Sequence, residues 1–391
     1  MNVRLGVAIH CRIFFATILS VLMTSLLLPV LVSAEDYEVH DAPLKVSYKK
    51  VRYKPVLPVE VQEIVAGSKF AAFSSNRELW IRARGTNLAP LSKLAQLPVD
   101  YDWYEKMCLV GEALVVSVAL YPEAQQIKEL ATQLGGYRSG PKPIGLLVVN
   151  FDPLRVSLIT ELEITQRPPV PEWLSKAPPE MVATPNRVKA SMQSCHWDGK
   201  QLIIGSYGHL AEVDLQHKTA KLLDVDFELS LNRLAILNEK EGLHVSVSEG
   251  GMGGSSIRTS WTDVDGKHQK IGYSLLNDYF ADADSLLRYQ NRLLASGERG
   301  VVQIHEVKRS FTHFRIGTKK SELPVYGLKA INGALWGVRK DGAVRIDLEN
   351  HAATVYQLDG QNVSNDVNAV SFIDGQWYVA TRKQLVTISI E

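Results

Sequence analysis

Short runs of hydrophobic residues alternate with turns of glycine, asparagine and aspartate along most of the chain. The stretch Asn332–Leu358, NGALWGVRKDGAVRIDLENHAATVYQL, holds three such runs, separated by a charged turn and a polar turn. Runs this short, rich in valine, isoleucine, leucine and tyrosine and bounded by turn residues, predict antiparallel strands joined by tight turns.

The same pattern returns along the chain. Strong copies begin at Asp198, Gln290 and Asp374, and weaker copies lie around residues 76, 111 and 242. The hydrophobic residue after the first turn marks seven repeats: Leu79, Leu114, Leu202, Leu243, Leu293, Leu335 and Trp377. Successive markers are separated by 35, 88, 41, 50, 42 and 42 residues. Repeats of this size with four short strands are typical of propeller blades, so the sequence predicts an all-β, seven-bladed β-propeller.

The last repeat is short of one strand, because only three can be recognised after Val367. The segment 44–55, LKVSYKKVRYKP, alternates as a strand does and has no partner in the first repeat. We therefore expect this N-terminal strand to close the ring by joining the last blade as its outer strand.

The long interval between Leu114 and Leu202 predicts one blade that carries two insertions. In segment 121–145, Pro122 and Glu123 mark a helix start and Gly135 a helix stop, which predicts a short helical insertion in blade two. The proline-rich segment 165–187 is expected to be extended, and to cover a blade edge rather than to recognise a partner.

The first 34 residues have the composition of a secretory signal. Arg4 and Arg12 precede the uncharged hydrophobic run 13–32, and Ala34 offers a cleavage site. We therefore expect residues 1–34 to be a signal peptide and residues 35–391 to be one exported propeller domain, periplasmic or secreted, with no further membrane span. The alternative is an uncleaved anchor, because about 20 hydrophobic residues are enough to cross a bilayer.

Two cysteines remain after the signal, Cys108 and Cys195. They could form a disulfide in an exported protein. Both stand just before the first turn of their repeats, which predicts similar positions on neighbouring blades rather than a face-to-face pair. Because a disulfide needs Cα atoms within about 7 Å, we expect two separate buried thiols.

Composition narrows the range of partners. Hydrophobic residues make up 46% of the chain and charged residues 22%, which is enough for a large core. The formal charge of +1 comes from 43 basic and 42 acidic residues, so no overall field favours nucleic acid or an anionic membrane. Any function based on charge must therefore be local.

The best repeats resemble a known group of propellers. The stretches DGKQLIIGSYGHLAEVDLQHKT and NGALWGVRKDGAVRIDLENHAAT are similar to the blade repeats of the YVTN/WD40-like and two-component-regulator propeller superfamilies. The resemblance covers most of the chain after the signal and implies a propeller fold. The Gly-His and Trp-Asp dipeptides of WD40 repeats do not recur from repeat to repeat, and the tryptophan docking repeats of quinoprotein dehydrogenases are missing, which disfavours a redox cofactor.

The longest loops are expected on one rim of the ring. In propellers, the turn between the second and third strands lies on the same side as the crossing to the next blade. Both insertions, the glycine-rich segment 249–256 and the crossing 273–284 occupy such places. Since loops on a rigid scaffold commonly carry function, this rim is the predicted binding face.

Basic residues recur in the second-to-third turns of repeats one, five, six and seven. An arc of this kind could clamp a carboxylate or phosphate. The alternative is a set of ordinary charged turns, because Glu298 and Asp341 stand among the cations. The predicted ligand-binding residues are Arg82, Arg84, Arg299, Arg339, Lys340, Arg382 and Lys383.

Signatures of catalysis are sparse, and no catalytic residue is assigned. His196 stands near Asp198 in the tripeptide HWD, but a turn role explains Asp198 better. One enzymatic alternative is a calcium-dependent propeller hydrolase, lactonase-like, or a lyase. Its ion would be held by oxygen ligands at the channel-facing starts of inner strands. The candidates are Asn232, Asp284 and Asn368.

Together these features favour an exported, non-enzymatic binding module. We expect no cofactor, although the alternative hydrolase would need calcium. Its partner would be a small anionic ligand, a glycan or a protein in the cell envelope, bound through the loop-elaborated face. A structural assembly role in the envelope is a third hypothesis, and its mark would be a large apolar patch on that rim.

Overall fold

The computed structural model describes residues 38–75, 78–98, 103–120, 142–167, 186–206, 209–223, 233–239, 242–251, 254–262, 268–271, 285–297, 300–305, 310–317, 324–360 and 364–390. The chain divides into two compact units, Met1–Glu38 and Val39–Glu391. Within these ranges the strands form seven sheets, and the one helix is the four-residue α2 (Leu91–Leu94).

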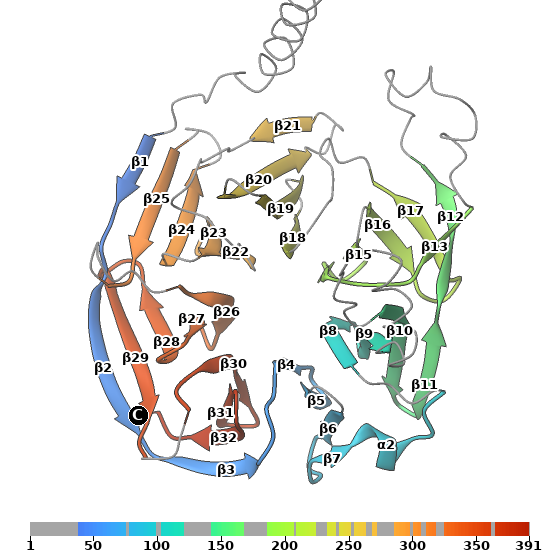
Figure 1. Ribbon diagram of the computed structural model, residues 1–391, viewed down its shortest axis with the longest axis horizontal. Coiled ribbons are helices and arrows are strands. Elements are labelled where there is room, and N and C mark those ends of the chain that lie inside the picture. Colours follow the sequence, from blue (N-terminus) through green and yellow to red (C-terminus); the bar gives the residue numbers. More distant parts are fainter. Residues whose placement is uncertain are drawn as a thin grey trace, which may run out of the picture. The chain divides into compact units, whose positions relative to one another are not determined.

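In each sheet, consecutive antiparallel strands follow one another from the axis of the ring outward, and in four sheets strands from elsewhere in the chain join the outer edge (Figure 1). The first sheet contains β4 (Glu63–Ala66), β5 (Phe70–Ser74), β6 (Leu79–Ala83) and β7 (Ala89–Pro90). The second contains β8 (Trp103–Val110), β9 (Ala113–Leu120), β10 (Lys142–Phe151) and β11 (Leu154–Ile159).

The third sheet has six strands, because two from the preceding connection join its outer edge. These are β14 (Ser194–Trp197), β15 (Leu202–Ser206), β16 (His209–Asp214) and β17 (Thr219–Leu222), followed by β12 (Glu161–Gln166) and β13 (Arg187–Lys189). The fourth contains β18 (Arg233–Glu239), β19 (Gly242–Gly251), β20 (Gly254–Thr262) and β21 (His268–Ile271).

Each of the last three sheets takes its outermost strand from the N-terminal segment. The fifth contains β22 (Leu286–Tyr289), β23 (Arg292–Gly297), β24 (Gly300–His305), β25 (Ser310–Arg315) and β1 (Glu38–Asp41). The sixth contains β26 (Tyr326–Ile331), β27 (Ala334–Arg339), β28 (Gly342–Asp347), β29 (Ala352–Leu358) and β2 (Lys45–Val51). The seventh contains β30 (Val367–Ile373), β31 (Gln376–Thr381), β32 (Leu385–Ile388) and β3 (Tyr53–Leu57).

The innermost strands contact one another in a closed cycle. Around the axis the order is β4, β8, β14, β18, β22, β26 and β30, and β30 contacts β4 again. This is the arrangement of a β-propeller, with almost no helix, as the repeats predicted.

Hydrophobic residues form the core between neighbouring sheets rather than at the axis. In β9, Leu114 and Val116 pack with Phe70 of the first sheet, whereas Val115 packs with Ile204 of the third. Successive side chains of a strand point to opposite faces, so an uninterrupted hydrophobic run buries both faces of one blade against two neighbours.

The prediction of seven full blades is corrected to six. Six sheets contain four strands of at least four residues, whereas the outermost strand of the first sheet, β7, has two residues. Pro90 in β7 lacks the amide that a longer pairing strand would donate, which contributes to its shortness.

The predicted position of the first repeat is also wrong by one strand. Leu79 lies in β6, the third strand of its sheet, and the second strand is β5. The other six markers all lie in second strands.

The segment 44–55 does not form the single closing strand that we predicted. Lys45–Val51 pairs in parallel with β29 of the sixth sheet, and Tyr53–Leu57 pairs antiparallel with β32 of the seventh. Arg52 separates the two strands, so the segment follows two successive sheet edges.

The two predicted insertions fall largely outside the described residues, as does the predicted signal 1–34. Of segment 121–145, only residues 142–145 are described, and they belong to β10. Of segment 165–187, residues 165–167 and 186–187 are described, and they adjoin or belong to β12 and β13, which pair antiparallel. Among the described residues, none of the helices meets the length and hydropathy needed to cross a membrane.

Candidate ligand-binding channel

Two cavities lie along the axis of the ring. One, of about 290 Å³, is lined by the first halves of inner strands and includes Gln62, Ser285 and Asn368. The other, of about 660 Å³, is lined by their second halves and includes Leu109, Asn332 and Phe372. Each inner strand begins where the crossing from the preceding blade arrives and ends at the first turn. The smaller cavity, which is lined by the first halves of these strands, therefore faces the rim of the crossings.

Both cavities share four residues, Glu63, Lys106, Leu328 and Lys329, which form the boundary between them. The Lys106 Nζ lies 3.0 Å from Glu63 Oε1, and these side chains are 40% and 17% exposed. The second carboxylate oxygen of Glu63 accepts a hydrogen bond of 2.8 Å from the Met107 amide. The ion pair and the amide together hold the Glu63 carboxylate at the channel wall.

Lys329 extends from the sixth sheet to the first. Its Nζ donates a hydrogen bond of 3.0 Å to the Ile64 carbonyl in β4. Among the described residues that line it, each cavity has two ammonium groups, of Lys106 and Lys329, and one carboxylate, of Glu63. A partly buried cation attracts an anion more strongly than one in bulk water, because the surroundings screen it less.

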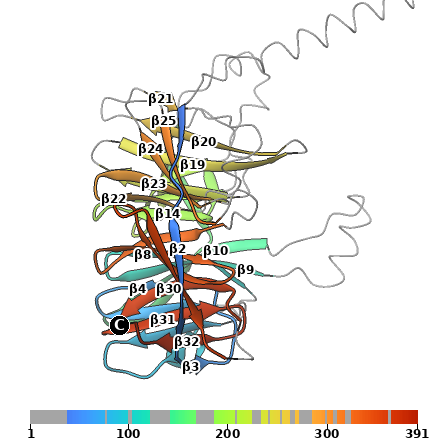
Figure 2. The ribbon, with the colours of Figure 1, turned by 90° about the vertical axis from the view of Figure 1, so that its left-hand side faces the viewer.

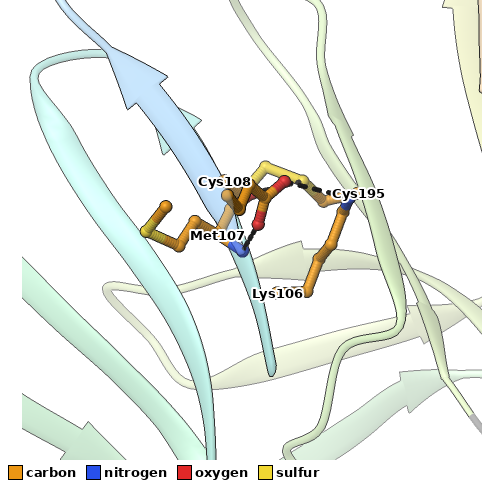
Figure 3. Close-up of a disulfide and its surroundings, with 5 residues drawn as sticks. Lys106, Met107, Cys108 and Cys195 are labelled. Atoms are coloured by element: carbon orange, nitrogen blue, oxygen red, sulfur yellow. Dashed lines mark hydrogen bonds and ion pairs between the residues drawn. A yellow bond between two sulfur atoms is a disulfide. The ribbon is translucent and has the colours of Figure 1, made fainter. Parts of the chain in front are cut away.

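Cys108 and Cys195 form a disulfide, which corrects the prediction of two separate thiols (Figure 3). Their Cα atoms are 6.2 Å apart. The residues do occupy similar positions on neighbouring blades, in β8 and β14. Inner strands converge on the axis and contact each other there, so equivalent positions come within bonding distance. Both cysteines line the larger cavity beside Lys106 and Met107.

Polar contacts join other inner strands around the axis. Arg288 of β22 binds Glu239 of β18, with Nε and Nη2 at 2.9 and 2.6 Å from Oε2. The Leu328 amide of β26 donates to Ser285 Oγ beside β22 at 3.0 Å. These contacts fix the positions of the strands that carry the channel residues.

The predicted basic arc is not brought together on one rim. Arg82 lies in β6, and its Nη1 donates a hydrogen bond to the Tyr378 hydroxyl. Its Nη2 lies 3.6 Å from Asp374 Oδ2, in the first turn of the seventh sheet. Burial raises the pKa of Tyr378 above its usual 10.0, while the Arg82 charge opposes this rise. Arg82 and the neighbouring Arg84 therefore stand at the opposite rim from the second-to-third turns.

Arg339 lies at the end of β27 and is only 1% exposed. Its Nε and Nη2 donate to the two oxygens of Asp341 at 2.7 and 3.0 Å. The Tyr48 hydroxyl also donates to Asp341, at 3.5 Å. The Arg339 guanidinium thus pairs with the Asp341 carboxylate in the turn that follows β27, and this carboxylate balances its charge.

The rest of the predicted arc is more open to solvent. The Arg382 side chain is 61% exposed, and its Nε lies 2.8 Å from Asp366 Oδ2. Lys340 and Lys383 are exposed. Arg299 lies outside the described residues. The structure therefore leaves three described cations of the arc exposed on the second-to-third turns.

One of the three calcium candidates can be located. The Asn368 amide nitrogen donates to the Val61 carbonyl at 2.9 Å and to Glu60 Oε1 at 3.4 Å. Asn232 and Asp284 fall outside the described residues. In the part of the chain that the structure describes, no three histidine, cysteine, aspartate or glutamate residues are grouped as a metal site.

The sequence reasoning missed Glu63, Lys106 and Lys329. Each is a charged residue within a short hydrophobic run, in EIVA, EKMCLV and LKAI. A charge inside an inner strand was the available signal, because such a side chain must find a partner or solvent at the axis.

No family model matches the chain, and a search of curated proteins gives no match. Solved structures do match, and they are propeller proteins. The extracellular domain of the putative hybrid two component system BT4673 from B. thetaiotaomicron is 12% identical with a TM-score of 0.57. The match covers 87% of this chain and 40% of that one.

Two further structures resemble the chain to a similar degree. The extracellular domain of the putative hybrid two component system BT3049 from B. thetaiotaomicron is 13% identical with a TM-score of 0.55, over 84% of this chain and 40% of that one. The structure described as YCF48 bound to D1 peptide is 11% identical with a TM-score of 0.54, over 90% and 98%. This chain thus spans two fifths of the BT4673 and BT3049 structures. At sequence identities this low, the similarity shows the fold alone.

Proposed function

We propose that this chain is an exported, non-enzymatic binding module that holds a small anion in the axial channel. The observation that carries the proposal is the boundary between the two cavities, where the ammonium groups of Lys106 and Lys329 lie with the carboxylate of Glu63. A carboxylate, phosphate or sulfate group in the channel would accept charge-assisted hydrogen bonds from these ammonium groups.

The loop-elaborated rim is the proposed entrance. The smaller cavity is lined by the starts of inner strands, where the crossings from preceding blades arrive. The ends of β9 and β10, and of β19 and β20, project to one side of the ring in Figure 2. Both pairs are second and third strands, so these strand ends lie on the side of the crossings.

Two observations support export. The disulfide between Cys108 and Cys195 fits an oxidising compartment, since thiols stay reduced in the cytosol. Two of the similar structures are described as extracellular domains of putative hybrid two component systems, and the other is described as bound to a peptide. Both descriptions agree with a module that recognises a ligand or partner outside the cytoplasm.

We also propose that the N-terminal segment closes the ring. The pairing of β3 with β32 beside the C-terminal strands supports this closure.

Isothermal calorimetry with phosphate, sulfate, citrate and glucuronate tests the binding site. We expect at least one anion to bind, and the variant Lys106→Gln/Lys329→Gln to weaken it at least tenfold, because each lost charge-assisted hydrogen bond contributes about 1.5–3 kcal/mol. The variant Arg187→Gln/Lys189→Gln, on the outer strand β13, should bind as the wild type does. Equal affinity in all three proteins, or no binding of any anion, would refute the proposed site.

A further inference from the structure

A strongly basic surface lies outside the channel, on the N-terminal segment. We call it the basic belt and define it as five exposed cations: Lys45, Lys49, Lys50, Arg52 and Lys54. No acidic residue occurs from Ala42 to Val59. A chain with a formal charge of +1 thus gathers five positive charges within ten residues, from 45 to 54.

The strands beneath the belt do not neutralise it. Strands β29 and β32, which pair with β2 and β3, have the sequences AATVYQL and LVTI and carry no charge. Asp341 is engaged by Arg339, and Asp41 binds Arg315 at 2.8 Å. Lys50 lies 3.7 Å from Asp359, an exposed pair of little energetic weight. Within the part of the chain that the structure describes, the other four belt cations form no ion pair.

Protection of a sheet edge explains only part of this charge. Lysines on an edge strand discourage another chain from pairing with it. The belt has five cations, and Arg52 lies between β2 and β3, where the segment leaves one sheet edge for the next. The charge therefore continues past the strand that would need protection.

The path of the belt indicates the shape of its partner. The belt follows the outer edges of two successive sheets around the perimeter of the ring (Figures 1 and 2). At about 3.3 Å per residue it extends up to about 30 Å. A flat bilayer touches a convex perimeter over a short distance, whereas a flexible chain can follow it and meet all five cations.

We propose that the basic belt binds a linear acidic polysaccharide. Successive carboxylate or sulfate groups along such a chain would pair with successive belt cations, and the hydroxyl of Tyr48, which is 55% exposed, lies among them. Binding would release counterions from the polysaccharide and would therefore weaken as salt rises. This surface is separate from the axial channel and does not depend on the function proposed for it.

The test uses the full chain and a heparin oligosaccharide as the probe, titrated over a series of NaCl concentrations. The variant Lys49→Gln/Arg52→Gln/Lys54→Gln removes three belt cations. Its slope of log affinity against log salt should be smaller in magnitude by about two to three. The matched control Arg155→Gln/Arg187→Gln/Lys189→Gln removes three exposed cations from other outer strands and should retain the wild-type slope.

Three outcomes would overturn the proposal: no heparin binding by the wild type, equal loss in both variants, or binding to anionic phospholipid vesicles without binding to heparin. Melting temperatures of both variants near that of the wild type would show that the comparison concerns binding and not folding. The Lys106→Gln/Lys329→Gln variant should bind heparin normally, which separates failure of the belt from failure of the channel.

Discussion

At the scale of single residues, two aspartates explain part of the repeat signature. Asp214 and Asp347 occupy matching places in VDLQHKT and IDLENHAAT, at the turn after the third strand. Asp214 Oδ1 accepts from the Gln216 and His217 amides at 2.9 and 3.0 Å, and Asp347 Oδ1 accepts from the Asn350 amide at 3.0 Å. The repeated aspartate thus satisfies backbone donors within its turn, which is a structural role.

Asp347 should make this turn sensitive to acid. The Asn350 side chain donates to its carboxylate and holds the pKa of Asp347 below the usual 3.8. Because the folded pKa is lowered, the stabilisation is present above pH 3.8 and is lost as the pH falls through the folded value. Asp347→Ala should lower the melting temperature at neutral pH by about 1–2 °C.

Scanning calorimetry across pH measures this effect. The difference between the wild type and Asp347→Ala should shrink as the pH falls below 3.8, and Asp347→Asn, which keeps an acceptor oxygen, should lose less. A difference that is constant down to low pH would show that the carboxylate charge does not contribute.

Residues of the channel were harder to predict than residues of the turns. Asp198 was expected to serve a turn, and its Oδ1 accepts from the amides of Lys200 and Gln201, both at 2.7 Å. That contact is local and can be read from neighbours in sequence. Lys329 meets Ile64 only because the ring brings the sixth sheet close to the first, and no local pattern contains that information.

At the scale of elements, the tight turns located the second strands of six sheets. The marker of the first repeat was placed one strand too late, because the run FAAFS follows GSK rather than an Asn-Gly or Asp-Gly turn, and the next run was taken in its place. The parallel pairing of β2 with β29 was also missed. Alternation shows that a segment is a strand, but the edge that it joins depends on which edges the folded ring leaves open.

The disulfide joins the inner strands of the second and third sheets, across a sequence separation of 87 residues. A cross-link over a loop of this length restricts the unfolded chain. Its loss in Cys108→Ser/Cys195→Ser should therefore reduce the free energy of unfolding by about 2–4 kcal/mol.

Urea denaturation with and without reductant measures the contribution of this cross-link. Reductant should lower the midpoint of the wild type and leave that of the double serine variant unchanged. Two titratable thiols in the unfolded, unreduced wild type would instead show that the cysteines are not joined.

At the scale of the whole ring, the repeats predicted the architecture, while contacts at the axis determine the position of the proposed anion site. Six full blades and one reduced sheet surround the channel, and the inner strands are joined by ion pairs, hydrogen bonds and a disulfide. Such cross-links hold Lys106, Lys329 and Glu63 in fixed positions, so little conformational entropy should be lost when an anion binds.

The most direct test is a crystal structure of the chain grown with selenate, whose selenium atom gives an anomalous signal and whose shape matches sulfate. Our account predicts an anomalous peak in the axial channel within hydrogen-bonding distance of Lys106 Nζ or Lys329 Nζ, and its absence in crystals of Lys106→Gln/Lys329→Gln. Selenate found only at exposed surface cations, with the channel free of it, would contradict the central claim.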